Sequence, residues 1–173
     1  MAVVASDILL KYSVAAAAGD TTVGTAAGSL GDQVSTTSIT SAQLNNIFDD
    51  VSGAEASAGD VEYRCVFVHN NHATDSAFNV TATVQSEVSG GATVQLALDN
   101  IGATAKGSAS AQAAVVANEN TAPSGVGTFG AGPLSIGTLT AGQVAGVWIK
   151  RTVASSTTNL SNDGFTLRIG GEG

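Results

Sequence analysis

The stretch that decides the fold is Asp60-Val-Glu-Tyr-Arg-Cys-Val-Phe-Val-His69. Its side chains alternate between two faces with a period of two, as they do along an extended strand. One face carries Val61, Tyr63, Cys65 and Phe67, and the other carries Glu62, Arg64, Val66 and Val68. β-branched and aromatic residues suit a pleated, packed surface, and neither Gly nor Pro interrupts the run. The pattern predicts a central strand that begins near solvent, where its charges lie, and ends inside a two-layer core.

Length and charge limit the classes of protein to be considered. A chain of 173 residues and 17.0 kDa suits one domain that buries roughly 70% of its unfolded surface. The formal net charge is −8, and such a surface repels phosphate backbones, so we expect no direct nucleic-acid binding. No apolar run approaches the ~20 residues that cross a bilayer, and the first residues do not resemble a signal peptide. We therefore expect no membrane contact and synthesis in a cytoplasm.

Alternating runs elsewhere predict more strands, at 7–14, 78–85, 93–99, 144–154 and 165–169, with a short one near 112–117. Val34 and Ile39 indicate only a weak strand, because their odd spacing puts them on opposite faces. The run 78–85 is expected to form a hairpin or a Greek-key step with 61–69. Strands separated by short turns, without a long amphipathic helix, predict an all-β fold. We expect a single β-sandwich domain over 1–173, jelly-roll-like in topology.

The same alternation predicts the core. The side chains expected to be largely buried are Val61, Tyr63, Cys65, Phe67, Phe78, Val80, Val84, Val147, Ile149, Phe165 and Leu167. Cys65 is the single cysteine, so it cannot form an internal disulfide, and on this face it is expected to be an inert thiol.

One short helix is predicted near 41–50. Thr40 and Gln43 have the spacing of a capping box, and Leu44, Ile47, Phe48 and Val51 recur at helical spacing. The carboxylates of Asp49 and Asp50 oppose the helix dipole at its C-terminal end, so the helix should stop there.

Two segments, 15–40 and 100–133, are dominated by Ala, Gly, Ser and Thr. Such segments bury little apolar surface of their own, so we expect extended arms or loops that order against a neighbour or a partner. Deletion of residues 15–35 is then expected to leave the sandwich folded.

Several short motifs invite a chemical interpretation, but each has a simpler explanation. His69-Asn-Asn-His72 has the spacing of half a zinc site, and no second Cys/His pair completes it. Asp99-Asn100 and Asn162-Asp163-Gly164 offer oxygens for calcium but fit turns better. Adjacent Asp49 and Asp50 point apart on a helix, so they form no catalytic dyad.

The remaining motifs also have simpler explanations. Gly125-Val-Gly127-Thr-Phe-Gly130 matches a dinucleotide-binding pattern, but Pro133 and a strand-like run follow where the helix should begin. Lys150 and Arg151 face opposite sides of a strand, which favours one salt bridge and one solvated charge. Asn79 and Asn159 begin glycosylation sequons that matter only after secretion. No Gly-x-Ser-x-Gly elbow is present. The sequence predicts no catalytic, cofactor-binding or metal-binding residues, and no enzyme.

Taken together, three regions resemble a group of small structural proteins of tailed bacteriophages. They are Ser6-Asp-Ile-Leu-Leu-Lys-Tyr-Ser13; Asn45-Asn-Ile-Phe-Asp-Asp-Val-Ser-Gly53 with Asp60–Asn70; and Gly146-Val-Trp-Ile-Lys-Arg-Thr-Val153 with Asn162-Asp-Gly-Phe-Thr-Leu-Arg-Ile169. This chain has a more Ala/Gly-rich middle, around 100–133, than that group. The resemblance implies a virion component of the capsid cement or decoration type, and it supplies no catalytic residues.

The function expected from this resemblance is adhesive. The chain would bind the outer surface of a phage head, with the major capsid protein as its partner, and form a homo-oligomer, with a trimer favoured over a dimer. The alternatives are a receptor- or glycan-binding module of a head or tail fibre, which needs exposed aromatic residues such as Tyr12, Tyr63, Phe129 or Trp148, and a neck or tail component.

Overall fold

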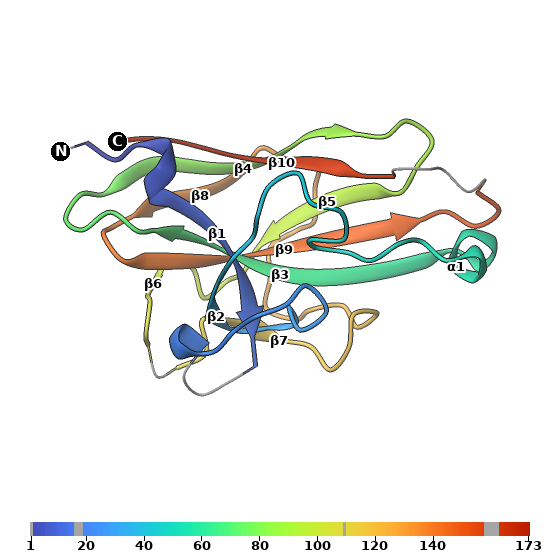
Figure 1. Cartoon of the computed structure of the whole chain (residues 1–173), viewed down its shortest axis with the longest axis horizontal. Coiled ribbons are helices and arrows are strands. Elements are labelled where there is room, and N and C mark those ends of the chain that lie inside the picture. The colour runs from blue at the N-terminus through green and yellow to red at the C-terminus, as the bar shows by residue number, and fades with distance from the viewer. Residues whose placement is uncertain (1, 16–18, 109, 158–162) are drawn as a thin grey trace.

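Two antiparallel β-sheets packed face to face make up the chain (Figure 1). The computed structural model describes residues 2–15, 19–108, 110–157 and 163–173. Its strands are β1 (Ile8–Val14), β2 (Gly31–Ser38), β3 (Asp60–Asn70), β4 (Ala77–Glu87), β5 (Thr93–Leu98), β6 (Thr104–Ala105), β7 (Ala113–Val115), β8 (Leu134–Leu139), β9 (Gln143–Val153) and β10 (Phe165–Glu172). The helical elements are η1 (Ala5–Asp7), η2 (Gly19–Thr21) and α1 (Gly53–Ala58). The predicted all-β class is confirmed, while the jelly-roll topology stays a prediction.

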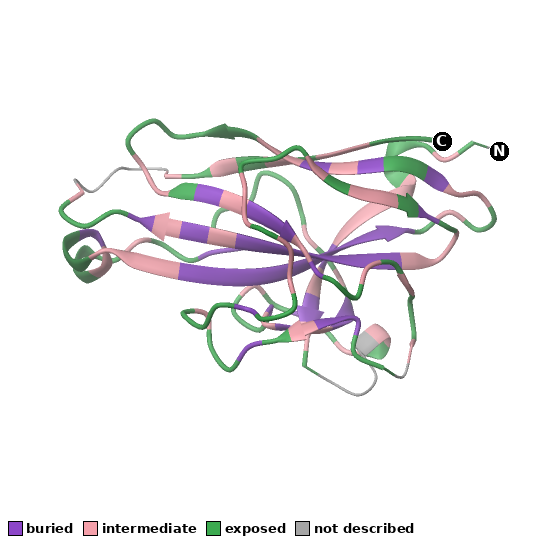
Figure 2. Cartoon of the chain, turned by 180° about the vertical axis from the view of Figure 1, so that it is seen from behind, coloured by how far each residue is buried: buried purple, intermediate pink, exposed green. Residues whose placement is uncertain are grey.

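The stretch 60–69 forms β3, near the middle of the seven-stranded sheet of order β5-β9-β3-β1-β2-β7, in which β6 also pairs with β9. Antiparallel neighbours flank β3 on both sides: Lys11 of β1 lies opposite Phe67, and Trp148 of β9 lies opposite Cys65. β3 is buried from Glu62 to its end, as the purple run in Figure 2 shows. The predicted central strand is confirmed, but its charged start is not near solvent.

The first core lies between the two sheets. The smaller sheet has the order β10-β4-β8 and covers one face of the larger one (Figure 1). Val66 and Val68 of β3 and Val147 and Ile149 of β9 point into this core. They pack against apolar residues of β4, β8 and β10, among them Leu139, which is fully buried. Alternation along β3 and β9 therefore sends every second side chain into the sandwich, but in β3 these are Val66 and Val68 and not the predicted core face.

The second core lies on the opposite face of the larger sheet. Tyr63, Cys65 and Phe67 of β3 and Trp148 of β9 belong to it, together with Val34 of β2. These residues share one core because the sheet curls: β2 and β7 return across the face of β3 and β9, below them in Figure 1. We call this curled part of the sheet the roll. The two faces of β3 thus serve two separate cores.

A buried carboxylate ties the two ends of the curled sheet together. Asp99, which follows β5, is fully buried, and its Oδ2 accepts hydrogen bonds from Nε1 of Trp148 (3.0 Å) and from the backbone N–H of Ala114 in β7 (2.7 Å). Its Oδ1 accepts from the N–H of Ile101 (3.0 Å). Gly31 allows the close approach of β2 to β7, because a Cβ there would overlap the Ala114 carbonyl and its φ is +97°.

The predicted helix near 41–50 is wrong. Residues 41–50 form turns and bends, in which Ala42 and Asn45 have positive φ values of 59° and 56° that no α-helix allows. Competing hydrogen bonds fix this loop: Nδ2 of Asn46 donates to the Thr40 carbonyl, and the Tyr12 hydroxyl donates to the Asn46 carbonyl. The helical spacing instead marks Ile47 and Phe48, which are buried in the first core, whereas Leu44 is 83% exposed.

The observed helix begins a few residues later. At α1, Ser52 is the N-cap, its hydroxyl accepting from the N–H of Glu55 while the Glu55 carboxylate accepts from the N–H of Ser52. This reciprocal pair is the capping box that the sequence analysis placed at Thr40 and Gln43. The segment Gly53–Ala58 has no apolar periodicity of its own, so the pair Ser52 and Glu55 is the local sequence signal for this helix.

Phe78 is the one predicted core residue that is exposed, at 49%. Asn79 has a φ of +50°, and the pairing of β4 with β8 shifts register between Ala77 and Val80. The irregularity breaks the alternation, so that Ala77 and Val80 both point into the core and Phe78 points outward. Val61, Val84, Phe165 and Leu167 are partly buried, and the remaining predicted core residues are buried: Tyr63, Cys65, Phe67, Val80, Val147 and Ile149.

The expected hairpin of 61–69 with 78–85 does not form, because β3 and β4 lie in different sheets. The small-residue segment 15–40 also differs from a free arm. Within it, β2 pairs with both β1 and β7 and carries the fully buried residues Val34 and Ser35. In segment 100–133, β7 and the buried Gln112 likewise belong to the roll. Low side-chain volume here allows close packing of strands.

Candidate functional site

The two histidines occupy different environments. His69 is 3% exposed and lies within β3, as part of the predicted strand. His72 lies in the loop after β3, where its Nδ1 accepts from the N–H of Thr74 (3.3 Å) and of Asp75 (2.9 Å). Among the described residues, neither histidine joins a cluster of three metal-ligating side chains. The ring of His72 organises a turn.

Both candidate calcium motifs contain a carboxylate that binds backbone N–H groups. Asp99 accepts three hydrogen bonds from protein donors, as described above, one of them in the turn to Ile101. Asp163 Oδ2 accepts from the N–H of Ala92 (2.7 Å), while Asn162 lies outside the described residues. The turn interpretation of Asp99 is confirmed, but the sequence did not indicate its bond to Trp148.

The glycine-rich motif 125–130 lies along the edge of β5. Leu96 and Gly130 exchange two backbone hydrogen bonds, and Gly127 donates to the Leu98 carbonyl. The next element is β8, and no helix follows the motif in the described chain. Without a helix N-terminus the motif lacks the dipole that a pyrophosphate requires. The glycines here cover a strand edge.

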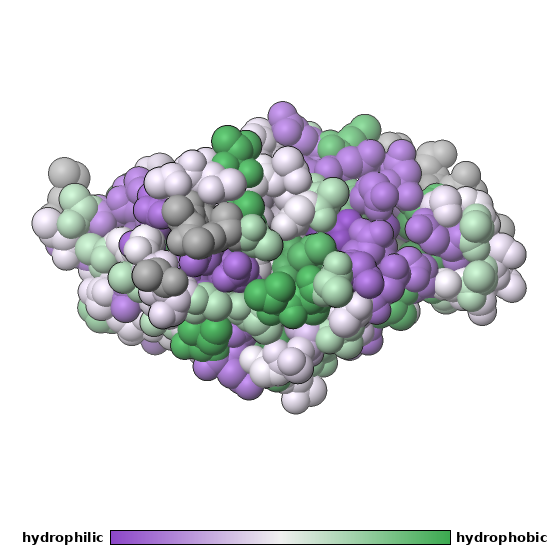
Figure 3. Space-filling view, turned by 90° about the horizontal axis from the view of Figure 1, so that it is seen from below, coloured by the Kyte–Doolittle hydropathy of each residue, from purple (hydrophilic) through white to green (hydrophobic). Residues whose placement is uncertain are grey.

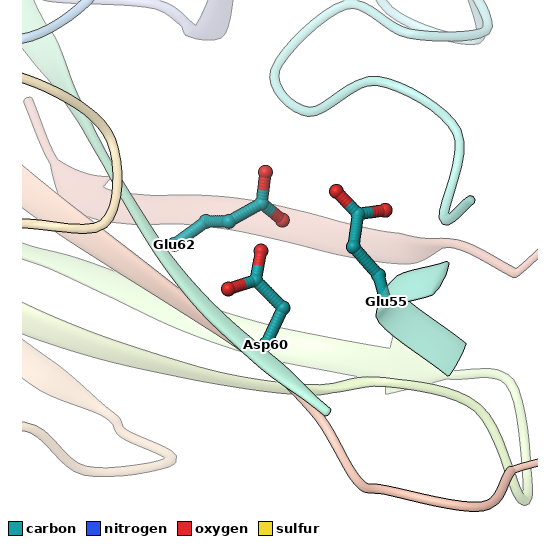
Figure 4. Close-up of side chains that lie close together, drawn as sticks. All are labelled: Glu55, Asp60 and Glu62. Carbon is teal, nitrogen blue, oxygen red and sulfur yellow. The ribbon is translucent and has the colours of Figure 1, made fainter. Parts of the chain in front are cut away.

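Three carboxylates converge at the start of β3 (Figure 4). One oxygen each from Glu55, Asp60 and Glu62 lie within 4.8 Å of one another. Each carboxylate already has a partner. Glu55 caps α1, Asp60 Oδ1 accepts from Nδ2 of Asn120 (2.9 Å), and Glu62 forms an ion pair with Arg151. The grouping joins α1, β3 and the loop after β7.

Arg151 is the centre of a buried ionic cluster. Its guanidinium pairs with Glu62 and donates to the Asp49 carbonyl oxygen (2.6 Å). It also lies 4.8 Å from the centroid of the Phe48 ring, a cation–π distance. Arg64 pairs with Glu119 and lies 5.7 Å from the same centroid. Burial raises the pKa of Glu62 above its ordinary value, and Arg151 opposes that rise.

This cluster corrects the prediction that the charges of β3 lie near solvent, because Glu62 and Arg64 are only 1% and 2% exposed. Glu62 lies directly opposite Arg151 in the register of β3 and β9, so the two charges compensate one another inside the protein. The partly buried Lys150, by contrast, donates to Oε1 of Gln95 (3.4 Å). The expected salt bridge of the Lys150-Arg151 pair therefore belongs to Arg151.

A cleft of about 520 Å³ opens beside this cluster. It lies between the loop 43–51, α1, the turn 90–94 and the start of β10. Phe48, Val94 and Phe165 contribute apolar surface, and Asp49, Asp50 and Asp163 contribute carboxylates. The described residues that line it include no histidine, cysteine or lysine. Its lining therefore offers surface for binding but no paired nucleophile and base.

The surface offers strand edges and exposed apolar side chains for contact. β10, β8 and β7 stand at the ends of their sheets, with no strand on their outer sides in the described chain. Among the described residues, the exposed large hydrophobic ones are Val4, Val23, Leu44, Phe78, Val88, Ile101 and Val115. Seen from the side of β2 and β7, hydrophobic residues gather in separate patches between hydrophilic ones (Figure 3). We call the outer sides of β7, β8 and β10 the open edges.

No family model, no curated protein and no solved structure matches this chain. Among the described residues, none of the helices has both the length and the apolar character needed to span a bilayer. The adhesive function expected from the phage resemblance therefore stands as a proposal that the surface of the molecule must support.

Proposed function

We propose that this chain is a structural protein of a virion, a capsid cement or decoration protein on the outer surface of a tailed-phage head. It is made in the cytoplasm of the bacterial host and has no catalytic role. The observation that carries this proposal is the combination of open strand edges with a surface poor in charge. Among these edges, β7 presents Val115, which is 57% exposed. An edge strand offers unpaired N–H and C=O groups to a partner chain.

The partner in this proposal is the major capsid protein, contacted by a homo-oligomer, with a trimer favoured over a dimer. A protein that binds only the assembled shell stabilises that shell by mass action. Charge pairing contributes little here, because the chain has only six Lys and Arg residues and two of them, Arg64 and Arg151, pair internally. Attachment then depends on apolar area and backbone hydrogen bonds.

The second candidate is a receptor- or glycan-binding module of a head or tail fibre, and the cleft beside Phe48 is the feature that favours it. Against it, the residues expected to form a sugar platform make contacts within the protein, and Phe78 is the exposed aromatic ring among the described residues. Trp148 is fully buried, Tyr63 is 9% exposed and packs edge-on against Phe129, and the Tyr12 hydroxyl bonds to the loop 40–51. A neck or tail component is the remaining alternative.

The copy number of this chain in purified virions tests the proposal. A cement protein is expected in a simple numerical ratio to the major capsid protein, whereas a fibre or neck protein is present in few copies. Quantitative mass spectrometry of intact particles measures that ratio. A few copies for each particle, or none, would contradict the proposal.

A binding assay with purified chain and phage heads that lack it tests whether the open edge of β7 makes the contact. The variant Val115→Lys places a charge on the open edge of β7, where it disfavours strand pairing, and should weaken binding. Val88→Lys, a matched change at a residue that is 37% exposed beyond the end of β4, serves as the control. Equal binding of both variants and the wild type would exclude the β7 edge.

A further inference from the structure

Polar side chains gather at one end of the roll. His69 of β3 lies opposite Val144 of β9, and Thr104 of β6 lies opposite the same Val144. Lys11 of β1 lies opposite Phe67. Side chains that face one another across a sheet share a face, and both Val144 and Phe67 belong to the second core. His69, Thr104 and Lys11 therefore project on the inner face of the roll.

Two buried polar atoms in this group have no hydrogen-bond partner. They are Nδ1 of His69, a residue that is 3% exposed, and Oγ1 of Thr104. Lys11 is 6% exposed, and its Nζ donates to the Thr36 carbonyl (2.9 Å), which uses one of its three N–H groups. Buried polar groups are rarely left unpaired, so each such atom needs a ligand or water to complete it.

The group also carries two lysines, and the Asp20 carboxylate lies beside Gly107, the residue after Lys106. Burial lowers the pKa of Lys11, and the nearby Lys106 lowers it further. Burial, Lys11 and Lys106 together lower the pKa of His69 to about 4. Within the described chain, the ion pairs belong to Arg64, Arg151 and His72, and no carboxylate lies within 4.0 Å of Lys11 or Lys106. Two lysines thus raise the local potential of a chain whose net charge is −8.

We propose that this end of the roll binds a small oxyanion, a phosphate or a carboxylate, between the ammonium groups of Lys11 and Lys106, with the Thr104 hydroxyl and Nδ1 of His69 as additional donors. The chemistry favours an anion because the lysines repel cations, and because a hydroxyl and a protonated imidazole nitrogen can each donate a hydrogen bond. The end of a rolled or barrel-like sheet is also a common place for a small ligand. This binding is independent of the capsid function proposed above.

Phosphate titration of the whole chain, followed by two-dimensional NMR, tests the proposal. Inorganic phosphate should shift the backbone amides of Lys11, His69 and Thr104 in a saturable way, and sodium chloride at matched ionic strength should not. A parallel titration with acetate distinguishes the two classes of anion. Saturation by acetate identifies a carboxylate site, and saturation by phosphate alone identifies a phosphate site. Absence of saturable shifts with both anions would overturn the proposal.

Two variants assign the binding to the lysines. Lys11→Met removes the buried ammonium at similar volume and should weaken phosphate binding at least about tenfold, the usual effect of losing one charge-assisted hydrogen bond. Lys150→Met, at a partly buried lysine of β9 that bonds Gln95, is the matched control and should bind as the wild type does.

Lys106 is exposed, so Lys106→Gln keeps the fold and provides an answer even if Lys11→Met does not fold. It should weaken binding several-fold for the same electrostatic reason. If Lys106→Gln, and Lys11→Met where it folds, bind phosphate with wild-type affinity, the anion lies elsewhere and the assignment is wrong.

Discussion

Single residues carry unusual properties here because the larger sheet is buried on both faces. Cys65 is fully buried in the second core, and burial raises the pKa of its thiol well above the ordinary value, with the nearby Asp99 adding to the effect. The Ser13 hydroxyl bonds to the thiol and opposes this rise only in part. The reactive thiolate is therefore scarce in the folded chain.

Cys65 is expected to resist thiol reagents in the native state. Labelling at pH 8 should proceed no faster than the chain unfolds, because the reagent needs an exposed thiolate. The same chain in denaturant should react rapidly and serves as the control. Mass spectrometry of timed samples measures both rates. Rapid labelling of folded protein would show that the second core opens easily.

His69 should make stability depend on pH. Its pKa is about 4 in the folded chain and about 6.5 when unfolded, so the unfolded chain binds more protons between these values. The contribution of His69 to the free energy of unfolding is then fully present above about pH 6.5. It is lost as the pH falls toward 4, by roughly 3 kcal/mol. The raised pKa of Glu62 acts in the opposite direction, since stability from that group falls as the pH rises.

Comparison of variants isolates the histidine. His69→Gln cannot titrate, so its free energy of unfolding should fall less steeply between pH 6.5 and 4 than that of the wild type. The corresponding change in the loop after β3, His72→Gln, gives the part of the slope that does not come from His69. Urea unfolding at several pH values gives these free energies. A wild-type slope in His69→Gln would contradict the assignment.

At the scale of the element, an irregular residue overrides a regular pattern. The positive φ of Asn79 turns Phe78 away from the core, although alternation predicted it inside. Phe67→Ala, in the second core, should cost about 3–5 kcal/mol of the free energy of unfolding. Phe78→Ala, the identical change at a residue that is 49% exposed, should cost less than about 1 kcal/mol. Equal losses in denaturant unfolding would place Phe78 in the core.

The strand β2 is an integral part of the sheet despite its small residues. It separates β1 from β7, and its Val34 contacts the core around Phe67. Deletion of residues 15–35 should therefore abolish cooperative unfolding, contrary to the expectation from composition. Ser at both Val23 and Ala27, two exposed loop positions, should leave the unfolding midpoint nearly unchanged. Near-UV circular dichroism during heating distinguishes these outcomes, and a deletion variant that melts cooperatively would restore the arm interpretation.

At the scale of the whole molecule, three of the six basic residues are buried: Lys11, Arg64 and Arg151. Arg64 and Arg151 pair with internal carboxylates, so few cations remain on the surface for a partner. If the chain binds phage heads, an increase from low to molar salt should release little of it, because screening acts on exposed charges that contribute only ~0–1 kcal/mol for each pair. Sedimentation of salt-washed heads measures the retained fraction. Complete release by salt would indicate an electrostatic interface instead.

The candidate sites show how far sequence reasoning reaches. Turn chemistry at Asp99 was predictable because a carboxylate bonds a nearby N–H in a short segment. The pairing of Glu62 with Arg151 was not predictable, since it depends on the register of two strands and the two residues lie 89 positions apart. The polar end of the roll was missed for the same reason: Lys11, His69 and Thr104 come onto one face only through the pairing of β1, β3, β9 and β6.

The sequence by itself determined the longer strands β1, β3, β4, β5, β9 and β10 and the face that each side chain takes in β3, β5 and β9. Alternation of side chains is a local property of extended backbone, so it can be read without knowing any neighbour. Only the tertiary structure decided the order of the strands, the position of β2 inside the sheet and the burial of Glu62 and Arg64. These features arise from pairing between distant segments, where the partner of a strand or a charge sets the energy of burying it.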